Sequence, residues 1–359
     1  MVFFVEKKIE NAHFINKKFY LDDRVFNKSI KNIFLNNPIY ILHKSTLKQT
    51  KELIPKKLYP NVINEEVILD TSNHDIKNIT SNTCTHRGHI ILDESCNKRI
   101  IQCPYHGRTF DNEGNLRSAP GFEQSIKKLK ETENLKSYSY FKFLNFYFLN
   151  NSQSKMKNYI EEYSNLFNWY PFEKLKPEKN HIKEYIINAH WALYVENYLE
   201  GLHIPYIHKD LVKEIDLKNY NIKVLSKAVL QIAKGKSSEN TFTTFKSCPL
   251  NLKSNSAFYL WIYPNIMINI YTWGISLNII EPVNKEKTII HYETYVLENT
   301  TKKQGAGGNL NKIETEDQNA ILKVQKGLKS SSYTPGKISA IHEKGIHHFH
   351  RLLCEDLNN

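Results

Sequence analysis

The sequence lacks long hydrophobic runs. No stretch of its 359 residues approaches the 18 apolar residues that a membrane-spanning helix needs. The run from Met1 to Val5 is too short for the apolar region of a signal peptide, and the charged Glu6 follows it. The length and a hydrophobic content of 40% predict a globular protein of about two domains.

Cysteine is scarce. The chain has five cysteines, an odd number, and Cys96, Cys248 and Cys354 stand far apart in the sequence. This distribution does not resemble the framework of a disulfide-rich secreted domain. We therefore expect the protein in a reducing cytoplasm.

Negative charge is in deficit, since 49 Lys and Arg residues exceed 37 Asp and Glu residues and give a net charge of +12. The positive charge is spread along the chain rather than clustered, so it does not indicate a nucleic-acid partner. One interpretation is a solvated basic surface. The functional interpretation is docking of an acidic electron-transfer protein, because complementary charge speeds encounter.

Two short motifs each combine one cysteine and one histidine, in Cys84–Gly88 and Cys103–Gly107. Structural zinc sites usually pair cysteine with cysteine and histidine with histidine, so zinc is the weaker interpretation. Two thiolates on one iron and two imidazoles on the other define a Rieske 2Fe-2S centre. The candidate ligands are Cys84, His86, Cys103 and His106.

A second candidate metal site lies in the segment that contains His203 and His208. In an ideal helix, residues five apart point about 140° away from each other, so both can face one metal only if the helix is broken between them. Pro205 would supply that break. With a carboxylate from elsewhere, the pair would form the two-His-one-carboxylate triad of non-haem iron enzymes. Two ordinary histidines are the alternative.

These motifs together resemble the Rieske non-haem iron oxygenases, in particular the terminal oxygenase (alpha) component of the ring-hydroxylating oxygenase family. The segment from Glu196 to His208 resembles the family's mononuclear-iron motif. The resemblance implies that His203 and His208 are iron ligands and that Asn197 and Glu200 are catalytic. It places Glu200 as the acid that hydrogen-bonds an iron histidine and a Rieske histidine across a subunit boundary, where ring-hydroxylating members usually have Asp.

The third iron ligand is implied by a later segment. On composition alone, the acids between Glu314 and Asp317 would mark the N-terminus of a helix. The string from Glu316 to Leu328 resembles a family segment that makes Asp317 the ligand, with Glu316 as the fallback.

We predict an α+β fold. Short strand-like runs bounded by polar turns indicate a β-rich domain, and later runs at 257–263, 266–273, 275–280 and 288–297 indicate an antiparallel sheet. Helical spacing follows from Lys312 to Leu328, through Ile313, Ala320 and Val324. The expected organisation is a helical lead-in (1–37), a Rieske 2Fe-2S domain (38–151), a connector (152–180) and a mononuclear-iron catalytic domain (181–359).

The resemblance also implies cofactors and partners. We expect a Rieske 2Fe-2S cluster, mononuclear Fe(II) and O2 as co-substrate. The chain has no Gly-x-Gly-x-x-Gly loop and no further iron–sulfur cysteine set, so NAD(P)H would act indirectly, through a separate flavin/iron–sulfur reductase or ferredoxin. A homotrimer is implied, with one subunit's cluster beside the next subunit's iron.

The substrate is expected to be a small molecule. The residues around Glu200 most resemble the choline monooxygenase and betaine or carnitine oxygenase branch, which implies hydroxylation or demethylation of a quaternary ammonium compound. Such a cation would suit the aromatic faces of Trp261, Tyr263, Tyr271 or Trp273, unless these rings form the core of the sheet. The alternatives are an aromatic ring-hydroxylating dioxygenase or O-demethylase, and a Rieske electron-transfer protein without oxygenase activity.

Overall fold

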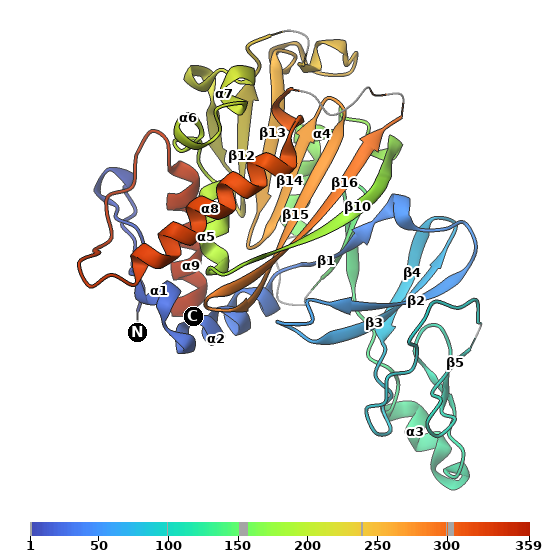
Figure 1. The fold of residues 1–359 in the computed structure, drawn as a ribbon. Coiled ribbons are helices and arrows are strands. Elements are labelled where there is room, and N and C mark those ends of the chain that lie inside the picture. The colour runs from blue at the N-terminus through green and yellow to red at the C-terminus, as the bar shows by residue number, and fades with distance from the viewer. Residues whose placement is uncertain (1, 99, 151–156, 238–239, 299, 301–304) are drawn as a thin grey trace. The chain divides into compact units, whose positions relative to one another are not determined.

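The chain folds into two compact units (Figure 1). The computed structural model describes residues 2–98, 100–150, 157–237, 240–298, 300 and 305–359. One unit comprises residues 37–157, and the other comprises residues 1–36 together with 158–359. The helical lead-in therefore packs with the C-terminal part of the chain, although it directly precedes the β-rich unit. Among the described residues, no helix is long and apolar enough to cross a membrane.

In the part of residues 37–157 that the structure describes, this unit contains three small antiparallel sheets and one short α-helix. The first sheet consists of β1 (Ile39–His43), β9 (Phe146–Leu149) and β8 (Tyr140–Phe143), and the second of β2 (Glu52–Leu58), β3 (Glu65–Ser72) and β4 (Asp75–Ser81). The third sheet consists of β5 (Ile101–Gln102), β6 (Thr109–Phe110) and β7 (Leu116–Ser118). Helix α3 spans Ile126–Thr132.

Tight turns set the hairpins of this unit. Asn73 and His74, between β3 and β4, both have positive φ (52° and 56°), as the two central residues of a type I′ hairpin turn require. A buried cluster that includes Leu53, Phe110 and Leu116 joins the second and third sheets. This core supports the two loops that carry the Cys–His motifs.

The second unit is built on a seven-stranded antiparallel sheet. Its strands, in spatial order, are β10 (Leu175–Ile187), β16 (Lys287–Leu297), β15 (Gly274–Asn284), β14 (Ile266–Tyr271), β13 (Asn255–Ile262), β12 (Ala228–Lys234) and β11 (Asn221–Val224). The four predicted runs are found as β13 to β16. Three strands were not predicted from the sequence. The two edge strands β10 and β11 are mostly exposed and rich in polar residues, whereas β12 is buried and was missed although it is largely apolar.

The helices of this unit are short except for two near the C-terminus. They are α1 (Lys18–Leu21), α2 (Asp23–Asn32), α4 (Lys157–Phe167), α5 (Trp191–Tyr198), α6 (Ile204–Ile207), α7 (Leu211–Glu214), α8 (Leu310–Leu328) and α9 (Lys344–Asn358).

Helices cover both faces of the sheet (Figure 1). On β13, Phe258 points toward Phe167 of α4, with ring centroids 5.8 Å apart, whereas Trp261 points toward Phe349 of α9, at 5.3 Å. Side chains alternate between the two faces of a strand, so Tyr259 lies on the same face as Trp261. This face, which α5, α8 and α9 cover, holds the candidate active site.

Helix α8 buries a different stripe from the one expected. The buried positions are Glu314, Ile321, Gln325 and Leu328, whereas Val324, which belonged to the predicted apolar stripe, is 50% exposed. A carboxylate and an amide thus belong to the buried face of the helix, beside the apolar positions that hydrophobic spacing had assigned to it. The α+β prediction as a whole is confirmed.

Candidate active site and metal centres

The two Cys–His motifs form a matched pair of loops in the unit of residues 37–157. In one loop the Gly88 N–H donates to the Cys84 carbonyl at 3.0 Å, and in the other the Gly107 N–H donates to the Cys103 carbonyl at the same distance. Both glycines have positive φ, 70° and 73°, a conformation that favours glycine. The same turn therefore occurs in both loops, and in each one the chain folds back so that the glycine contacts its own cysteine.

The four predicted cluster ligands divide into an inner and an outer pair. The thiols of Cys84 and Cys103 lie in the hydrophobic core at 3% and 2% exposure. The imidazoles of His86 and His106 lie nearer the surface, with ring centroids 4.7 Å apart. This arrangement puts one pair of donors on the buried side of a cluster and the other pair on the side that faces solvent.

The donor set fits a two-iron cluster better than zinc. Ligands of one zinc ion bind at about 2.0–2.3 Å, so their donor atoms lie within about 4.6 Å of one another. Among the described residues, a group of three or more His, Cys or acidic side chains with donor atoms within 4.8 Å of one another occurs at the second predicted site. The four residues of the two loops do not form such a group. His86 Nδ1 is buried without a hydrogen-bond partner, as expected of an atom that binds a metal.

A buried arginine adjoins the second loop. The Arg108 guanidinium, 3% exposed, forms an ion pair with Glu133 and donates to Thr85 Oγ1 at 3.3 Å. Its charge acts on both Cys84 and His86. Sequence reasoning did not single out this residue, although it directly follows the second motif.

The second predicted site is assembled in the other unit. His203 lies between α5 and α6, His208 directly follows α6, and Asp317 lies on α8. Asp317 Oδ1 is 2.9 Å from His208 Nε2 and 3.6 Å from His203 Nε2. One donor atom from each residue lies within 4.8 Å of the others, so the three can hold one metal ion.

The chain between the histidines differs from the expected broken helix. The interruption lies before His203, where α5 has ended at Tyr198, and Pro205 lies in the first turn of α6 rather than breaking a helix. Proline suits the first turn because its missing N–H would have no helical partner there. The histidines therefore flank a four-residue helix, which directs both rings toward α8.

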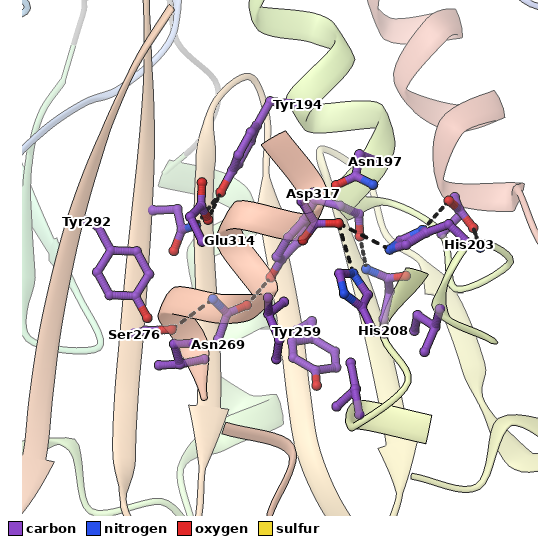
Figure 2. Close-up of a pocket in the computed structure, with 18 of the residues that line it drawn as sticks. Tyr194, Asn197, His203, His208, Tyr259, Asn269, Ser276, Tyr292, Glu314 and Asp317 are labelled. Carbon is purple, nitrogen blue, oxygen red and sulfur yellow. Dashed lines mark hydrogen bonds and ion pairs between the residues drawn. The ribbon is translucent and has the colours of Figure 1, made fainter. Parts of the chain in front are cut away.

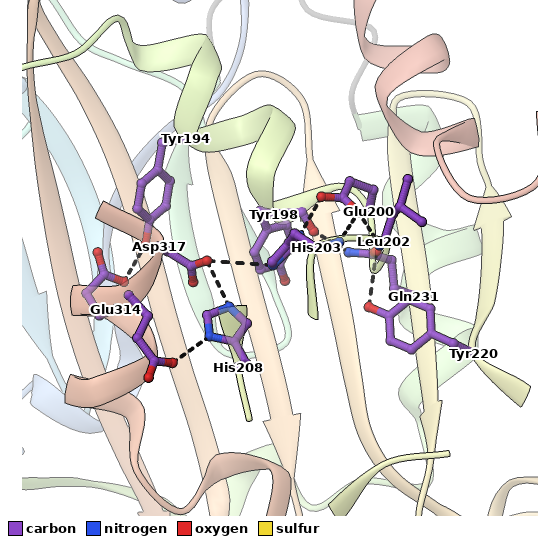
Figure 3. Close-up of polar contacts among 11 residues, drawn as sticks. Tyr194, Tyr198, Glu200, Leu202, His203, His208, Tyr220, Gln231, Glu314 and Asp317 are labelled. Carbon is purple, nitrogen blue, oxygen red and sulfur yellow. Dashed lines mark hydrogen bonds and ion pairs between the residues drawn. The ribbon is translucent and has the colours of Figure 1, made fainter. Parts of the chain in front are cut away.

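Two further carboxylates hold the outer ring nitrogens of the histidines (Figure 3). Glu200 contacts His203 Nδ1 and also accepts a hydrogen bond from the His203 N–H at 3.1 Å. Glu316 Oε2 is 2.8 Å from His208 Nδ1. A carboxylate on Nδ1 fixes the tautomer that leaves Nε2 free for a metal. Glu316, the fallback ligand, thus contacts His208 on its outer side.

A cavity of about 100 Å³ lies directly beside the three residues (Figure 2). Its walls come from the sheet and from α5, α6 and α8. Its lining is rich in tyrosine and carboxamide side chains, namely Tyr194, Tyr198, Tyr220, Tyr259, Tyr271 and Tyr292 with Asn197, Gln231, Asn269 and Asn278.

Glu314 lies in this cavity at 5% exposure. Its carboxyl accepts hydrogen bonds from the Tyr194 hydroxyl at 2.6 Å and from the Gln318 amide at 2.9 Å. Burial raises the pKa of this carboxyl to about 7, although both hydrogen bonds act to lower the pKa. The sequence suggested only an acidic helix N-terminus here, because α8 starts earlier than the acids imply.

The four aromatic residues proposed for a cation are divided by the structure. Tyr271 lines the cavity, and Trp273 stacks on Tyr271 with ring centroids 5.1 Å apart. Trp261 and Tyr263 pack against Phe349 of α9 and belong to the core. The tyrosines that do line the cavity come from several elements, which no single stretch of sequence reveals.

Asn197 and Glu200 lie between this cavity and a second one of about 420 Å³. His203 also borders both cavities, and the second is partly lined by Glu196 and Glu343. The Glu200 side chain is 10% exposed, so it is not a solvated helix residue.

Comparisons with known proteins follow this division of the chain. The family model described as the Rieske [2Fe-2S] domain matches residues 39–139. The model described as the ring hydroxylating alpha subunit (catalytic domain) matches residues 168–357, more than half of the chain.

Individual relatives cover most of the chain. It is 28% identical to the carnitine monooxygenase oxygenase subunit of Acinetobacter pittii (strain PHEA-2), over 94% of this chain and 93% of that protein. It is also 28% identical to the chloroplastic choline monooxygenase of Beta vulgaris, over 77% of this chain and 63% of that protein.

Solved structures show the same fold. A crystal structure of a quaternary ammonium Rieske monooxygenase with an inhibitor matches with a TM-score of 0.78 and 25% identity, over 98% of this chain and 99% of that one. Naphthalene 1,2-dioxygenase from Rhodococcus sp., bound to indole, shares the fold at a TM-score of 0.71 and 14% identity, over 96% of this chain and 93% of that one. The protein therefore belongs to the ring-hydroxylating alpha-subunit family of Rieske oxygenases, oxidoreductases that use a Rieske 2Fe-2S cluster, mononuclear iron and O2.

Proposed function

We propose that this protein is the oxygenase component that hydroxylates or demethylates a small quaternary ammonium compound. The observation that carries the proposal is the small cavity beside His203, His208 and Asp317, which is lined by tyrosines and contains the buried carboxyl of Glu314. Aromatic faces and an anion are the groups that bind a quaternary ammonium. Two relatives of this chain are named as carnitine and choline monooxygenases.

In this proposal, His203, His208 and Asp317 hold the mononuclear iron, and Cys84, His86, Cys103 and His106 hold the cluster. The iron, when bound, activates O2 with electrons that the cluster delivers. Glu200 and Glu316 each accept a hydrogen bond from the outer nitrogen of an iron-binding histidine, which keeps the inner nitrogen unprotonated. The tyrosines exclude water from the space next to the metal ligands.

Glu200 is also proposed to link the two metal sites. Its side chain contacts His203 and borders both cavities, and a histidine from another subunit would approach it from the second cavity. We infer a homotrimer in which one subunit's cluster lies beside the next subunit's iron. Asn197, like Glu200, borders both cavities. A similar protein of known structure, a quaternary ammonium Rieske monooxygenase, is described as using inter-subunit electron transfer.

A separate polypeptide would supply the electrons. The chain has no Gly-x-Gly-x-x-Gly loop for a dinucleotide, so NAD(P)H and flavin would be bound by a reductase, or by a reductase with a ferredoxin. The net charge of +12 favours an acidic docking partner. We also infer a cytoplasmic location, because none of the five cysteines forms a disulfide bond.

The arene dioxygenase or O-demethylase alternative fits this cavity less well. A planar hydrocarbon gains little from a lining of hydroxyl, carboxamide and carboxyl groups, whose desolvation it cannot repay. The alternative of an electron carrier does not explain three metal-binding side chains arranged around one point.

The test is an anaerobic screen in which ligands are added to the ferrous protein with the cluster reduced. Choline, L-carnitine and glycine betaine are compared with naphthalene and methoxybenzoates, and binding is measured by perturbation of the ferrous-site spectrum. We expect a response to at least one quaternary ammonium compound and none to the arenes. A response to the arenes alone would refute the proposed substrate class.

A further inference from the structure

The cavity contains a buried carboxyl group whose charge no cation balances. Both oxygens of Glu314 accept hydrogen bonds from neutral donors, the hydroxyl of Tyr194 and the amide of Gln318. Among the described residues no Lys or Arg forms an ion pair with it, and the neighbouring charge that acts on it is a second anion, Asp317. A buried carboxylate without a counter-charge is costly, unless a ligand brings the charge.

Two polar atoms beside Glu314 also lack partners. Asn278 Oδ1 and the Tyr292 hydroxyl are buried without a partner at hydrogen-bonding geometry, although the Ser276 hydroxyl approaches that of Tyr292, and both side chains are 5% exposed and line the cavity. The Asn278 amide nitrogen already donates to the Tyr194 hydroxyl at 2.7 Å, which leaves its oxygen as a free acceptor. Buried polar atoms in a native protein are normally hydrogen-bonded, so these two mark places for ligand atoms.

These two atoms can bind one group. Asn278 on β15 and Tyr292 on β16 are directly opposite residues in the antiparallel register, so their side chains lie side by side. The free tyrosine hydroxyl can donate, and the free carboxamide oxygen can accept. A ligand hydroxyl does both and would satisfy the pair.

We propose, on the basis of the function proposed above, that Glu314 receives the quaternary ammonium group of the substrate and that Tyr292 and Asn278 bind a hydroxyl a few bonds away. Figure 2 shows Glu314 beside Tyr194, with Tyr292 and Ser276 on the neighbouring strands. The assignment names specificity-determining residues: Glu314 selects the charge, and the Asn278–Tyr292 pair selects a hydroxylated chain.

The position of Glu314 also determines which carbon faces the metal ligands. Glu314 and Asp317 are three residues apart on α8, a rise of about 4.5 Å along the helix axis. A nitrogen held at Glu314 therefore presents carbons that are one or two bonds from that nitrogen to the residues that hold the metal. Oxidation would occur close to the ammonium group rather than at the far end of the molecule.

The test compares ligands that differ by one atom or one group, with dissociation constants measured by anaerobic calorimetry on the metal-loaded protein. Choline and L-carnitine are each paired with an isostere in which carbon replaces the nitrogen. The isostere of choline is the neutral 3,3-dimethylbutan-1-ol, and that of L-carnitine is 3-hydroxy-5,5-dimethylhexanoate, which keeps the carboxylate. We expect the wild type to prefer the cation at least tenfold in at least one pair, which corresponds to about 1.4 kcal/mol. Glu314→Gln should reduce this preference to less than threefold without changing the affinity for the carbon isostere.

The control variant is Glu355→Gln, which removes the same charge from an exposed side chain on α9 and should leave the preference unchanged. Iron content and circular dichroism of each variant show that the fold and the metal site are intact, and Glu314→Asp provides a second substitution if the glutamine variant does not fold. A cation preference that survives in Glu314→Gln overturns this assignment alone. A wild type without any cation preference overturns the proposed substrate class as well.

The proposed binding of a substrate hydroxyl is tested with the variant Tyr292→Phe. Choline is compared with ethyltrimethylammonium, and L-carnitine with gamma-butyrobetaine, pairs that differ only by the hydroxyl group. The preference for the hydroxylated compound, measured as the ratio of the two dissociation constants in a pair, should be at least fivefold smaller in the variant than in the wild type. The preference for the cation should be unchanged. An unchanged hydroxyl preference overturns the role of Tyr292.

Discussion

The buried carboxyl of Glu314 makes a prediction about folding stability that does not depend on any ligand. Burial raises its pKa from the ordinary value of 4.5 to about 7. In metal-depleted protein, the folded state therefore keeps this proton up to about pH 7, whereas the unfolded state loses it near pH 4.5. The folded state binds more protons in this window, so stability falls as the pH rises through it.

The size of the effect follows from the two pKa values. Each pKa unit corresponds to about 1.4 kcal/mol, so the wild type should lose about 3 kcal/mol of unfolding free energy, most of it between pH 5 and pH 7. Glutamine at position 314 has no proton to lose. Glu314→Gln should therefore become more stable relative to the wild type by about that amount on going from acid to pH 8.

Tryptophan fluorescence can follow this unit selectively. All four tryptophans of the chain, Trp169, Trp191, Trp261 and Trp273, belong to the unit that contains Glu314. Urea unfolding of the metal-depleted wild type and Glu314→Gln gives the difference in unfolding free energy between the two proteins at pH 5 and at pH 8. Glu355→Gln, an exposed charge loss, should show the same difference from the wild type at both pH values.

A stability difference between Glu314→Gln and the wild type that is independent of pH would refute the argument. It would show that the carboxyl is ionised in the folded state throughout this range, and that some group compensates its charge without any ligand.

Other predictions concern the metal sites. Asp317→Ala should lose the mononuclear iron and keep the visible spectrum of the cluster; iron that remains at wild-type content by metal analysis would exclude Asp317 as a ligand. Glu316→Gln should keep all three ligands but weaken iron binding about 10- to 100-fold in a chelator competition, because His208 loses its charged partner; unchanged affinity would contradict this role. Glu200→Gln should retain both metals yet slow the reoxidation of the reduced cluster by O2 at least tenfold in single-turnover stopped flow, and wild-type rates would argue against a link through Glu200. Arg108→Met should lower the reduction potential of the cluster by on the order of 50 mV in a redox titration, because a buried positive charge stabilises the reduced form; a potential that stays or rises would refute this.

Much of the chemistry of this protein is local in sequence. The two Cys–His motifs each form a self-contained loop, closed by a hydrogen bond from a glycine to its own cysteine, so a few adjacent residues specify the turn and its two donors. The iron histidines likewise flank one short helix. Strands β13 to β16 were predictable from their runs of apolar residues, whereas the exposed edge strands carry no such signal; the buried strand β12 was missed although its residues are largely apolar.

Contacts between residues that are far apart in the sequence could not be predicted from local motifs. The pairing of Asn278 with Tyr292 depends on strand register, and the opposite roles of Tyr259 and Trp261 depend on which helix covers each part of one sheet face. Hydrophobic spacing assigned Val324 to the buried stripe of α8, but the cavity accepts polar groups and Glu314 is buried instead.

The acidic segment of α8 separates what the sequence determines from what requires the tertiary structure. The sequence by itself determined that Glu314, Glu316 and Asp317 are carboxylates close together on a helix, and its resemblance to the family singled out Asp317. The tertiary structure alone decided what each one contacts: Tyr194 in the cavity for Glu314, the outer nitrogen of His208 for Glu316 and the inner nitrogen for Asp317. The physical reason is the geometry of the helix, which turns each successive side chain by about 100°, so that neighbouring carboxylates of the same chemistry face different surroundings once α8 packs onto the sheet.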